Sequence, residues 1–120
     1  MKRVLLLALM LLPATAFAQR MSRVTGAQLL SSCSASQFSR VQNCEAYLDG
    51  MADTFAGFMK FGPKDKQGRP LAAVVCIPPD VTGKDLRLAV LRGLQAQPSL
   101  QARQAGEAVE RILRQSYPCH

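Results

Sequence analysis

The stretch FSRVQNCEAYLDGMADTFAGFMKF, residues 38–61, decides the fold. Its apolar residues recur every three or four positions, which places them on one stripe of an α-helix: Val41, Cys44, Leu48, Met51, Phe55, Phe58 and Met59. Ser34, Ser36 and Ser39 offer N-terminal caps, and Gly62-Pro63 ends the run. At about 1.5 Å per residue the helix spans roughly 35 Å, the width of a small domain. We therefore predict a central helix against which the rest of the chain packs.

The first 18 residues are typical of a secretory signal peptide. Lys2 and Arg3 form a basic start, residues 4–12 are an apolar run, and Ala16-Phe17-Ala18 has the form of a cleavage site. The apolar run is too short to span a bilayer, and no later run is long enough. We expect residues 19–120 to form one exported domain with no membrane segment after signal cleavage.

The predicted domain, residues 19–120, holds thirteen basic and eight acidic side chains, a net charge of +5. The basic residues are scattered and form no stripe with aromatic residues, which argues against a nucleic-acid partner. Their excess favours an acidic partner surface or simply solubility. A domain of this size buries roughly two thirds of its unfolded surface, which is enough for one core.

Four cysteines in the exported part predict two disulfides: Cys33, Cys44, Cys76 and Cys119. Three pairings are possible. Proximity along the chain favours one bridge between Cys33 and Cys44, which would pin a helical corner. The other would then tie Cys119 to Cys76, and the chain-entropy model values the two at roughly 3 and 4 kcal/mol. There is no CxxC and the only histidine is His120, so we expect no metal and no cofactor.

Shorter helices are expected on both sides of the central one. Thr25 can cap a helix that ends near Cys33. Thr82 and Asp85 form a weak capping box for another helix, whose buried face is predicted to be Leu86, Ala89, Val90, Gly93 and Leu94. Ser99 is expected to cap the last helix, in which the apolar stripe is Ala105, Ala108, Val109, Ile112 and Leu113. The fold class is therefore a small all-α bundle of four to five helices.

The clearest break in the chain is GPKDKQGRP, residues 62–70. Two prolines, two glycines and four charged residues in nine positions predict an exposed loop. Residues 71–77, LAAVVCI, follow it and fit either a turn of helix or an extended buried segment. Pro78 and Pro79 prevent a helix from continuing past them.

The residues that carry chemistry do not combine into a catalytic site. Glu45, Asp49 and Asp53 recur every four residues on the central helix and could host paired carboxylates or a divalent metal. An ordinary solvated face with basic neighbours from another helix is the favoured interpretation. Asp53 is the exception, because its side chain could cap another helix or bond the backbone of a loop. No Gly-x-Ser-x-Gly, Gly-rich phosphate loop or closely spaced Cys pair occurs. We therefore predict that the protein is not an enzyme.

The order of motifs resembles a known family. Cys44-x2-Tyr47-x2-Gly50-x2-Asp53 is followed by Cys76-Ile77-Pro78, by Val81-Thr82 before a helix, and by Tyr117-Pro118-Cys119. This order is similar to the Rap/Tai family of periplasmic immunity proteins against type VI secretion amidase effectors. The likeness covers nearly all of residues 19–120. Gly83 departs from the pattern, because a larger residue is usual after Val-Thr.

The resemblance implies an all-helical periplasmic protein, commonly a homodimer, that binds a peptidoglycan amidase and blocks its active-site cleft. It implies structural roles for the motif residues. The four cysteines would be the bridges, and Tyr47 and Tyr117 would be anchors whose hydroxyl groups need partners. Gly50 would allow close helix packing, and Pro78 would set a turn.

An inhibitor must fill a cleft, so the exposed loop is the candidate partner-binding segment. It offers five side chains for contacts: Lys64, Asp65, Lys66, Gln67 and Arg69. Pro63 and Pro70 would limit the freedom of the loop and so lower the ordering cost on binding. The alternative for the loop is a solvated connector. The alternative for the protein is a structural or chaperone-like periplasmic protein without a cognate toxin.

Overall fold

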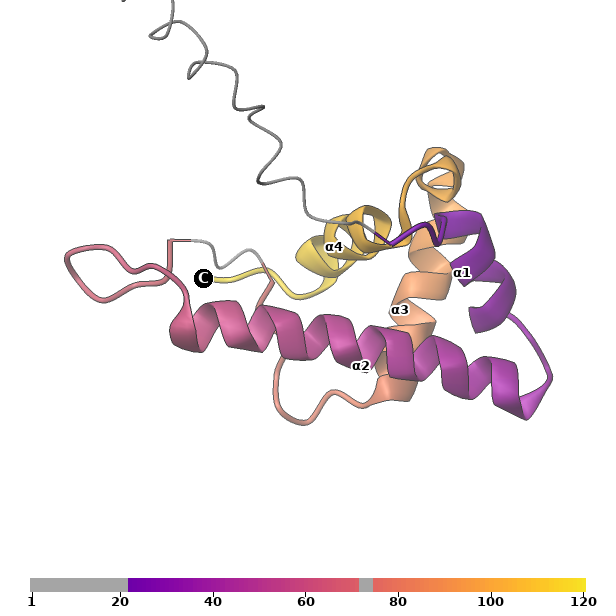
Figure 1. The fold of residues 1–120 in the computed structure, drawn as a ribbon, viewed down its shortest axis with the longest axis horizontal. Coiled ribbons are helices and arrows are strands. Elements are labelled where there is room, and N and C mark those ends of the chain that lie inside the picture. Colours follow the sequence, from indigo (N-terminus) through magenta and orange to yellow (C-terminus); the bar gives the residue numbers. More distant parts are fainter. Residues whose placement is uncertain (1–21, 72–74) are drawn as a thin grey trace, which may run out of the picture.

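The chain folds into helices joined by short connections, apart from the long connection over residues 62–82 (Figure 1). A computed structural model describes residues 22–71 and 75–120, and the predicted signal peptide, residues 1–18, lies outside these ranges. The elements are α1 (Gly26–Cys33), α2 (Phe38–Phe61), α3 (Gly83–Ala96), the 3₁₀ helix η1 (Pro98–Ala102) and α4 (Ala105–Ser116). No strand occurs among the described residues, so the all-α prediction is confirmed.

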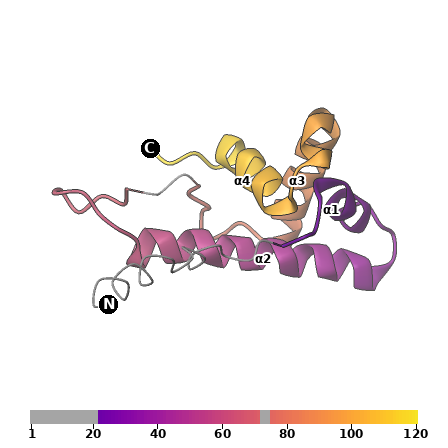
Figure 2. The ribbon, with the colours of Figure 1, turned by 45° about the horizontal axis from the view of Figure 1, so that its top comes forward.

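The long helix α2 forms the base of the molecule, and the other helices gather over one half of it. In two views α1 and α3 lie over the N-terminal half of α2 and α4 lies over its middle, while the last turns of α2 extend away from them (Figures 1 and 2). Helix α3 packs against α1, α2 and α4. The largest buried side chains of the core come from α2, α3 and α4 and from the segment before α3: Leu48, Val75, Leu86, Val90, Leu94, Val109 and Leu113.

Both predicted helix caps form, because Thr is followed three residues later by a side chain that can return the bond. The Thr25 hydroxyl accepts from the Gln28 amide, and the Gln28 side chain accepts from the Thr25 amide at 2.9 Å. Thr82 and Asp85 make the same reciprocal pair at the start of α3. Each box satisfies two amides that the first turn of a helix leaves without partners.

The two disulfides pair as expected. Cys33 is bridged to Cys44 and Cys76 to Cys119, with Cα–Cα distances of 5.1 and 5.0 Å. The first bridge joins the end of α1 to the second turn of α2, and both of its cysteines are fully buried. The second joins the chain after α4 to the segment before α3. Each therefore fixes a place where the helices alone would leave the chain free to move.

The prediction that everything packs against the central helix is wrong for its C-terminal part. Cys44 and Leu48 are buried, but Phe58 is 51% exposed and Phe61 is 80% exposed. Periodicity places residues on one stripe, yet none of the other helices in the described part of the chain covers the last turns of α2 (Figures 1 and 2). The serine caps are also wrong, because the N-cap residue is Gln37 and its side chain makes no capping bond.

The last helix begins later than predicted. Residues Pro98–Ala102 form the separate helix η1, so Ser99 lies inside η1 and does not cap α4. Helix α4 starts at Ala105 after Gln104. The amide of Ala105 donates to the carbonyl of Val24 at 2.8 Å, and the amide of Gly26 donates to the carbonyl of Arg103. These bonds hold the start of α4 against the chain that leads into α1, and the predicted apolar stripe of α4 is buried.

The segment before α3 is extended where the structure describes it. Val75 is buried, and the amide of Cys76 donates to the carbonyl of Tyr117 at 2.9 Å. Residues 72–74 of the predicted buried segment lie outside the described ranges. Pro78 sets a turn as expected, since its carbonyl accepts from the amide of Val81. None of the helices within residues 22–71 and 75–120 has the length and apolar character needed to cross a membrane.

We predict that two substitutions on α2 separate its packed half from its projecting half. Leu48→Ala removes a fully buried side chain and is expected to lower the free energy of unfolding by about 2–5 kcal/mol. Phe61→Ala changes an exposed side chain and is expected to change it by less than about 0.5 kcal/mol. Urea denaturation followed by circular dichroism measures both. An equal loss of stability in the two variants would contradict the described packing.

Candidate functional site

The predicted loop projects from the end of α2 that the bundle leaves uncovered (Figures 1 and 2). Helix α2 ends at Phe61, and the amide of the next residue, Gly62, donates to the carbonyl of Phe58 at 3.0 Å. Pro63 follows and prevents a further turn. The chain then runs out and returns as a narrow hairpin over residues 62–71. This is the position that an inhibitory loop would need, away from the core and free to enter a cleft.

The loop is held in shape by bonds between its two sides. Lys64 and Pro70 form an isolated antiparallel bridge, and the amide of Leu71 donates to the carbonyl of Pro63 at 2.8 Å. At the tip, Gly68 has a φ of 78°, which a residue with a side chain rarely adopts. The loop therefore has a defined conformation before any partner binds, and the cost of ordering it on binding is reduced.

Asp65 organises the tip of the loop from inside. Its Oδ1 accepts from the amides of Gln67 and Arg69, each at 2.9 Å, and its Oδ2 pairs with the Arg69 Nε at 2.7 Å. The backbone bond from Arg69 is the main cause that lowers the pKa of Asp65 below its usual value, with the Arg69 side chain and the Gln67 amide adding to it. Asp65 is one of the five predicted contact residues, but its carboxylate is engaged in bonds within the loop.

The other four predicted contact residues face solvent and give the loop a positive surface: Lys64, Lys66, Gln67 and Arg69. The Lys64 ammonium also donates to the carbonyl of Lys60, in the last turn of α2, at 3.0 Å. A cation is favourable there because the carbonyl end of a helix carries partial negative charge. Lys60 itself is exposed, so this end of the molecule carries four basic groups and one acid that is already bonded.

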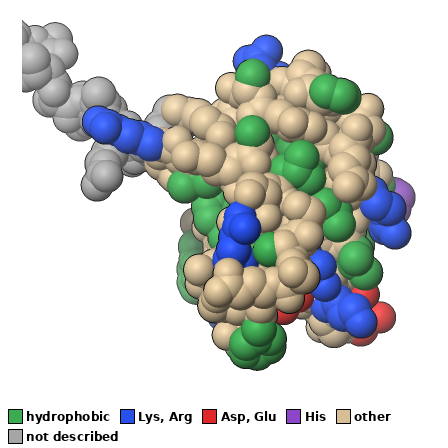
Figure 3. Space-filling model, turned by 90° about the vertical axis from the view of Figure 1, so that its right-hand side faces the viewer, with side chains coloured by type: hydrophobic (Ala, Val, Ile, Leu, Met, Phe, Trp, Pro, Cys, Tyr) green, Lys and Arg blue, Asp and Glu red, His purple; other side chains and the backbone are tan. Residues whose placement is uncertain are grey.

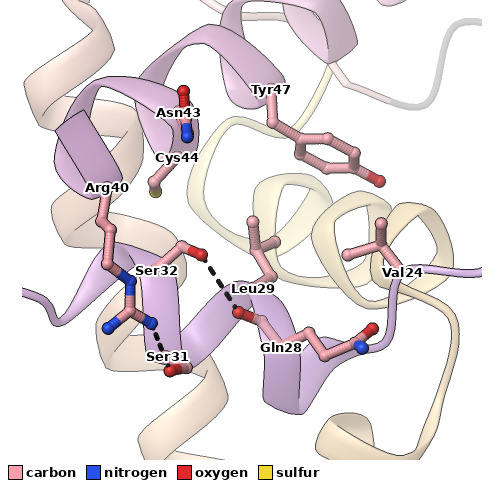
Figure 4. A pocket seen from close by; sticks show the side chains of 9 residues that line it. All are labelled: Val24, Gln28, Leu29, Ser31, Ser32, Arg40, Asn43, Cys44 and Tyr47. Carbon is pink, nitrogen blue, oxygen red and sulfur yellow. Dashed lines mark hydrogen bonds between the residues drawn. The ribbon is translucent and has the colours of Figure 1, made fainter.

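A separate groove lies between α1 and the first half of α2 (Figure 4). Its volume is about 480 Å³. At one end Arg40 donates to the Ser31 hydroxyl at 2.6 Å, and at the other the Tyr47 ring lies near Leu29 and Val24. Burial raises the pKa of the Tyr47 hydroxyl, so it stays neutral. The polar groups of this groove include no histidine or carboxylate that could serve as a base.

Only some of the motif residues have the structural roles that were expected of them. The Tyr47 and Tyr117 hydroxyls form no hydrogen bond with the residues that the structure describes, although the Tyr117 carbonyl accepts from Cys76. The expectation of close packing at Gly50 is wrong. Gly50 is exposed, and no described atom outside its own helix lies within 4 Å of where a Cβ would stand. In contrast, Gly26 and Gly93 meet other elements so closely that a Cβ would overlap Leu100 or Ile112.

The three carboxylates of α2 have separate surroundings. Glu45 pairs with Arg87 of α3 at 2.9 Å, as the solvated-face interpretation predicted. Asp49 lies against the start of α3, where its oxygens would be 3.2 Å from a Cβ on Gly83, which explains the small residue there. Asp53 caps no helix and bonds no loop within the described ranges. Among residues 22–71 and 75–120 no cluster of three metal-ligating side chains occurs.

Sequence analysis missed Arg87, which joins three helices. Besides Glu45, it reaches the carbonyl of Cys33 at the end of α1, at 3.3 Å. The one signal in the sequence is its place directly after the buried Leu86, which brings a basic side chain to the edge of the core.

The opposite end of the molecule offers no comparable surface. Seen from the end where α2 begins, apolar side chains lie in separate spots among polar and basic ones (Figure 3). The outer face of α4 is crossed by ion pairs, with Glu107 bonded to Arg111 at 3.0 Å and Glu110 bonded to Arg114. In both pairs the acid stands four residues before the base, a spacing that stabilises a helix surface. The loop is therefore the candidate site.

We predict that acid loosens the loop before it unfolds the bundle. The folded pKa of Asp65 lies below its unfolded value of about 3.9, so its contribution is fully present above about pH 4 and is lost as the pH falls through the folded pKa. Amide exchange of Gln67 and Arg69 should rise over that range while exchange in α4 stays slow. Asp65→Ala, which removes both accepting oxygens, should show fast loop exchange already at pH 7. Equal protection of the loop amides in this variant would contradict the role of Asp65.

Comparison with known proteins supplies the family. No curated protein and no solved structure matches the chain. A family model described as Rap1a immunity proteins matches residues 25–119, which include all four helices, the loop and both disulfides. The match covers most of the chain, and it agrees with the motif order noted in the sequence. The chain therefore belongs to the Rap1a family of immunity proteins.

Proposed function

We propose that this protein is a periplasmic immunity protein that binds a peptidoglycan amidase effector of type VI secretion and blocks its active site without catalysing a reaction. Membership in an immunity family supports binding to a secreted effector. Two disulfides are typical of an oxidising compartment, as the periplasm is. The resemblance of the motifs supports an amidase as the target.

One observation carries the proposal: an internally bonded, basic loop projects from the uncovered end of α2. A protein that blocks a cleft needs a protrusion that keeps its shape, because ordering a floppy segment would oppose binding. The basic groups of the loop also suit an enzyme surface with exposed carboxylates, which would speed association. We therefore assign Lys64, Lys66, Gln67 and Arg69 to the contact surface, with Asp65 holding their arrangement.

The loop assignment predicts a large loss of inhibition on charge reversal. Lys64→Glu and Lys66→Glu together should weaken binding to the effector at least tenfold, which is about 1.4 kcal/mol. Arg92→Glu, an exposed change on α3, is the matched control and should leave binding within about twofold. Binding is measured by calorimetry, and inhibition by release of peptide from purified peptidoglycan, with an amidase effector sought in the neighbouring reading frames.

Two results would oppose the proposal. Full inhibition by the double variant would remove the loop from the contact surface. No binding to the neighbouring effector by the wild-type protein, together with protection of unrelated proteins from aggregation, would favour the chaperone-like alternative.

We also propose a homodimer, as the resemblance implies. The outer face of α2 offers the best contact, because a shallow hollow of about 310 Å³ lies over Gly57 between Thr54, Phe58 and Phe61. Close approach is possible there, since no described atom outside α2 lies within 4 Å of a Cβ built on Gly57. Burying the two exposed phenylalanines would supply a favourable apolar contact.

The dimer surface predicts a change of mass on substitution. Phe58→Glu with Phe61→Glu should convert a dimer to a monomer in light scattering, because two desolvated carboxylates would face each other across the contact. Phe38→Glu, equally exposed at the other end of α2, should leave the mass unchanged. Light scattering is repeated on the wild-type protein at millimolar concentration and after 100-fold dilution. A monomeric mass at both concentrations would refute the dimer.

A further inference from the structure

A groove under the projecting half of α2 has the character of a binding surface. It lies between that half of the helix and residues 75–81, and its volume is about 650 Å³. Its walls are mainly apolar and half-buried, with Phe55 and Met59 on one side and Ile77 and Val81 on the other. The exposed Ala56 leaves room between them. Surfaces of this kind, concave and apolar with few polar groups, are where proteins receive side chains of a ligand.

Asp53 is the one charged residue in the lining of this groove. Its carboxylate makes no ion pair or hydrogen bond with any residue in the described ranges. Asp80 follows Pro79, which lines the groove, and Asp49 stands one turn before Asp53 on the same flank of α2. These two also have no ion pair within the part of the chain that the structure describes.

The other carboxylates of the domain are already engaged. Glu45 pairs with Arg87, Asp65 with Arg69, Glu107 with Arg111 and Arg103, and Glu110 with Arg114, while Asp85 serves the cap of α3. Of the three remaining acids, Asp53 lines the apolar groove, Asp80 directly follows a residue that lines it, and Asp49 stands one helical turn from Asp53, in a domain that otherwise carries an excess of basic groups. A ligand for this groove should combine an apolar side chain with a positive charge.

We infer that the groove receives a segment of the effector in which an apolar residue stands beside Lys or Arg. The inference rests on the proposed function and extends it, because the groove follows α2 to within two residues of the point where the loop begins. One partner can therefore contact both. The basic loop requires an acidic area on the partner, and the acidic groove requires a basic one. Such opposite charges on neighbouring surfaces fix the orientation of a complex.

Substitutions in the groove test the inference against the purified effector. Ala56→Phe fills the groove and Asp53→Lys reverses its charge, and each is expected to weaken binding at least tenfold. Ala46→Phe and Gln42→Lys make the same chemical changes at exposed positions of α2 outside the groove and should stay within twofold. Circular dichroism and thermal unfolding verify that all four variants fold. Wild-type affinity in both groove variants would overturn the inference and leave the proposed function standing.

A second measurement keeps the groove testable if the effector does not bind at all. Capped peptides containing Leu-Lys or Leu-Glu are titrated into the protein, and the methyl signals of Ile77 and Met59 are followed by NMR. The Leu-Lys peptide should shift them, the Leu-Glu peptide should not, and Asp53→Asn should abolish the difference. Equal shifts with both peptides would overturn the inference. So would a change from dimer to monomer in Ala56→Phe, because a second copy would then be the occupant.

Discussion

The bonds made by Arg87 determine how the helices meet. From α3 this side chain reaches Glu45 on α2 and the last carbonyl of α1, and it is largely withdrawn from solvent. A guanidinium group can do this because its donors point in several fixed directions, whereas a lysine could serve only one site well. The carbonyl end of α1 also favours a cation. The Cys33–Cys44 bridge closes the same corner covalently, so α1 has little freedom relative to α2 and α3.

With that corner fixed, the position of the loop follows from helix length alone. Helix α2 has 24 residues, more than α1, α3 or α4, and its N-terminal half is committed to the corner and the core. Its remaining turns must extend past the bundle. The second bridge and the bond between Cys76 and Tyr117 hold residues 75–81 beneath those turns, which leaves a groove instead of a packed interface. The loop and the groove therefore have the same cause: α2 is longer than the bundle of helices that packs on it.

Local chemistry in the sequence predicted the helices well and their surroundings less well. The pairs Thr25 with Gln28 and Thr82 with Asp85 mark helix starts because capping depends on a few neighbouring residues. Exposure of Phe58 and Phe61 could not be predicted, since the 3.6-residue period does not reveal whether another element lies opposite. Ser99 after Pro98 has the pattern of a cap, and the start of α4 at Ala105 is set by backbone bonds to Val24 and Gly26, which are distant in sequence. The loop was predictable from its composition, but the inward bonds of Asp65 were not.

The covalent corner has a consequence for when the protein can work. A bridge between Cys33 and Cys44 cannot persist where thiols are kept reduced. A chain still in the cell interior would therefore lack the covalent constraint on α1. The Cys33 carbonyl, to which Arg87 donates, would then be held less firmly. Maturation would be completed only on the oxidising side of the membrane. The same bond that stabilises the fold thus ties a fully constrained α1 to an oxidising compartment.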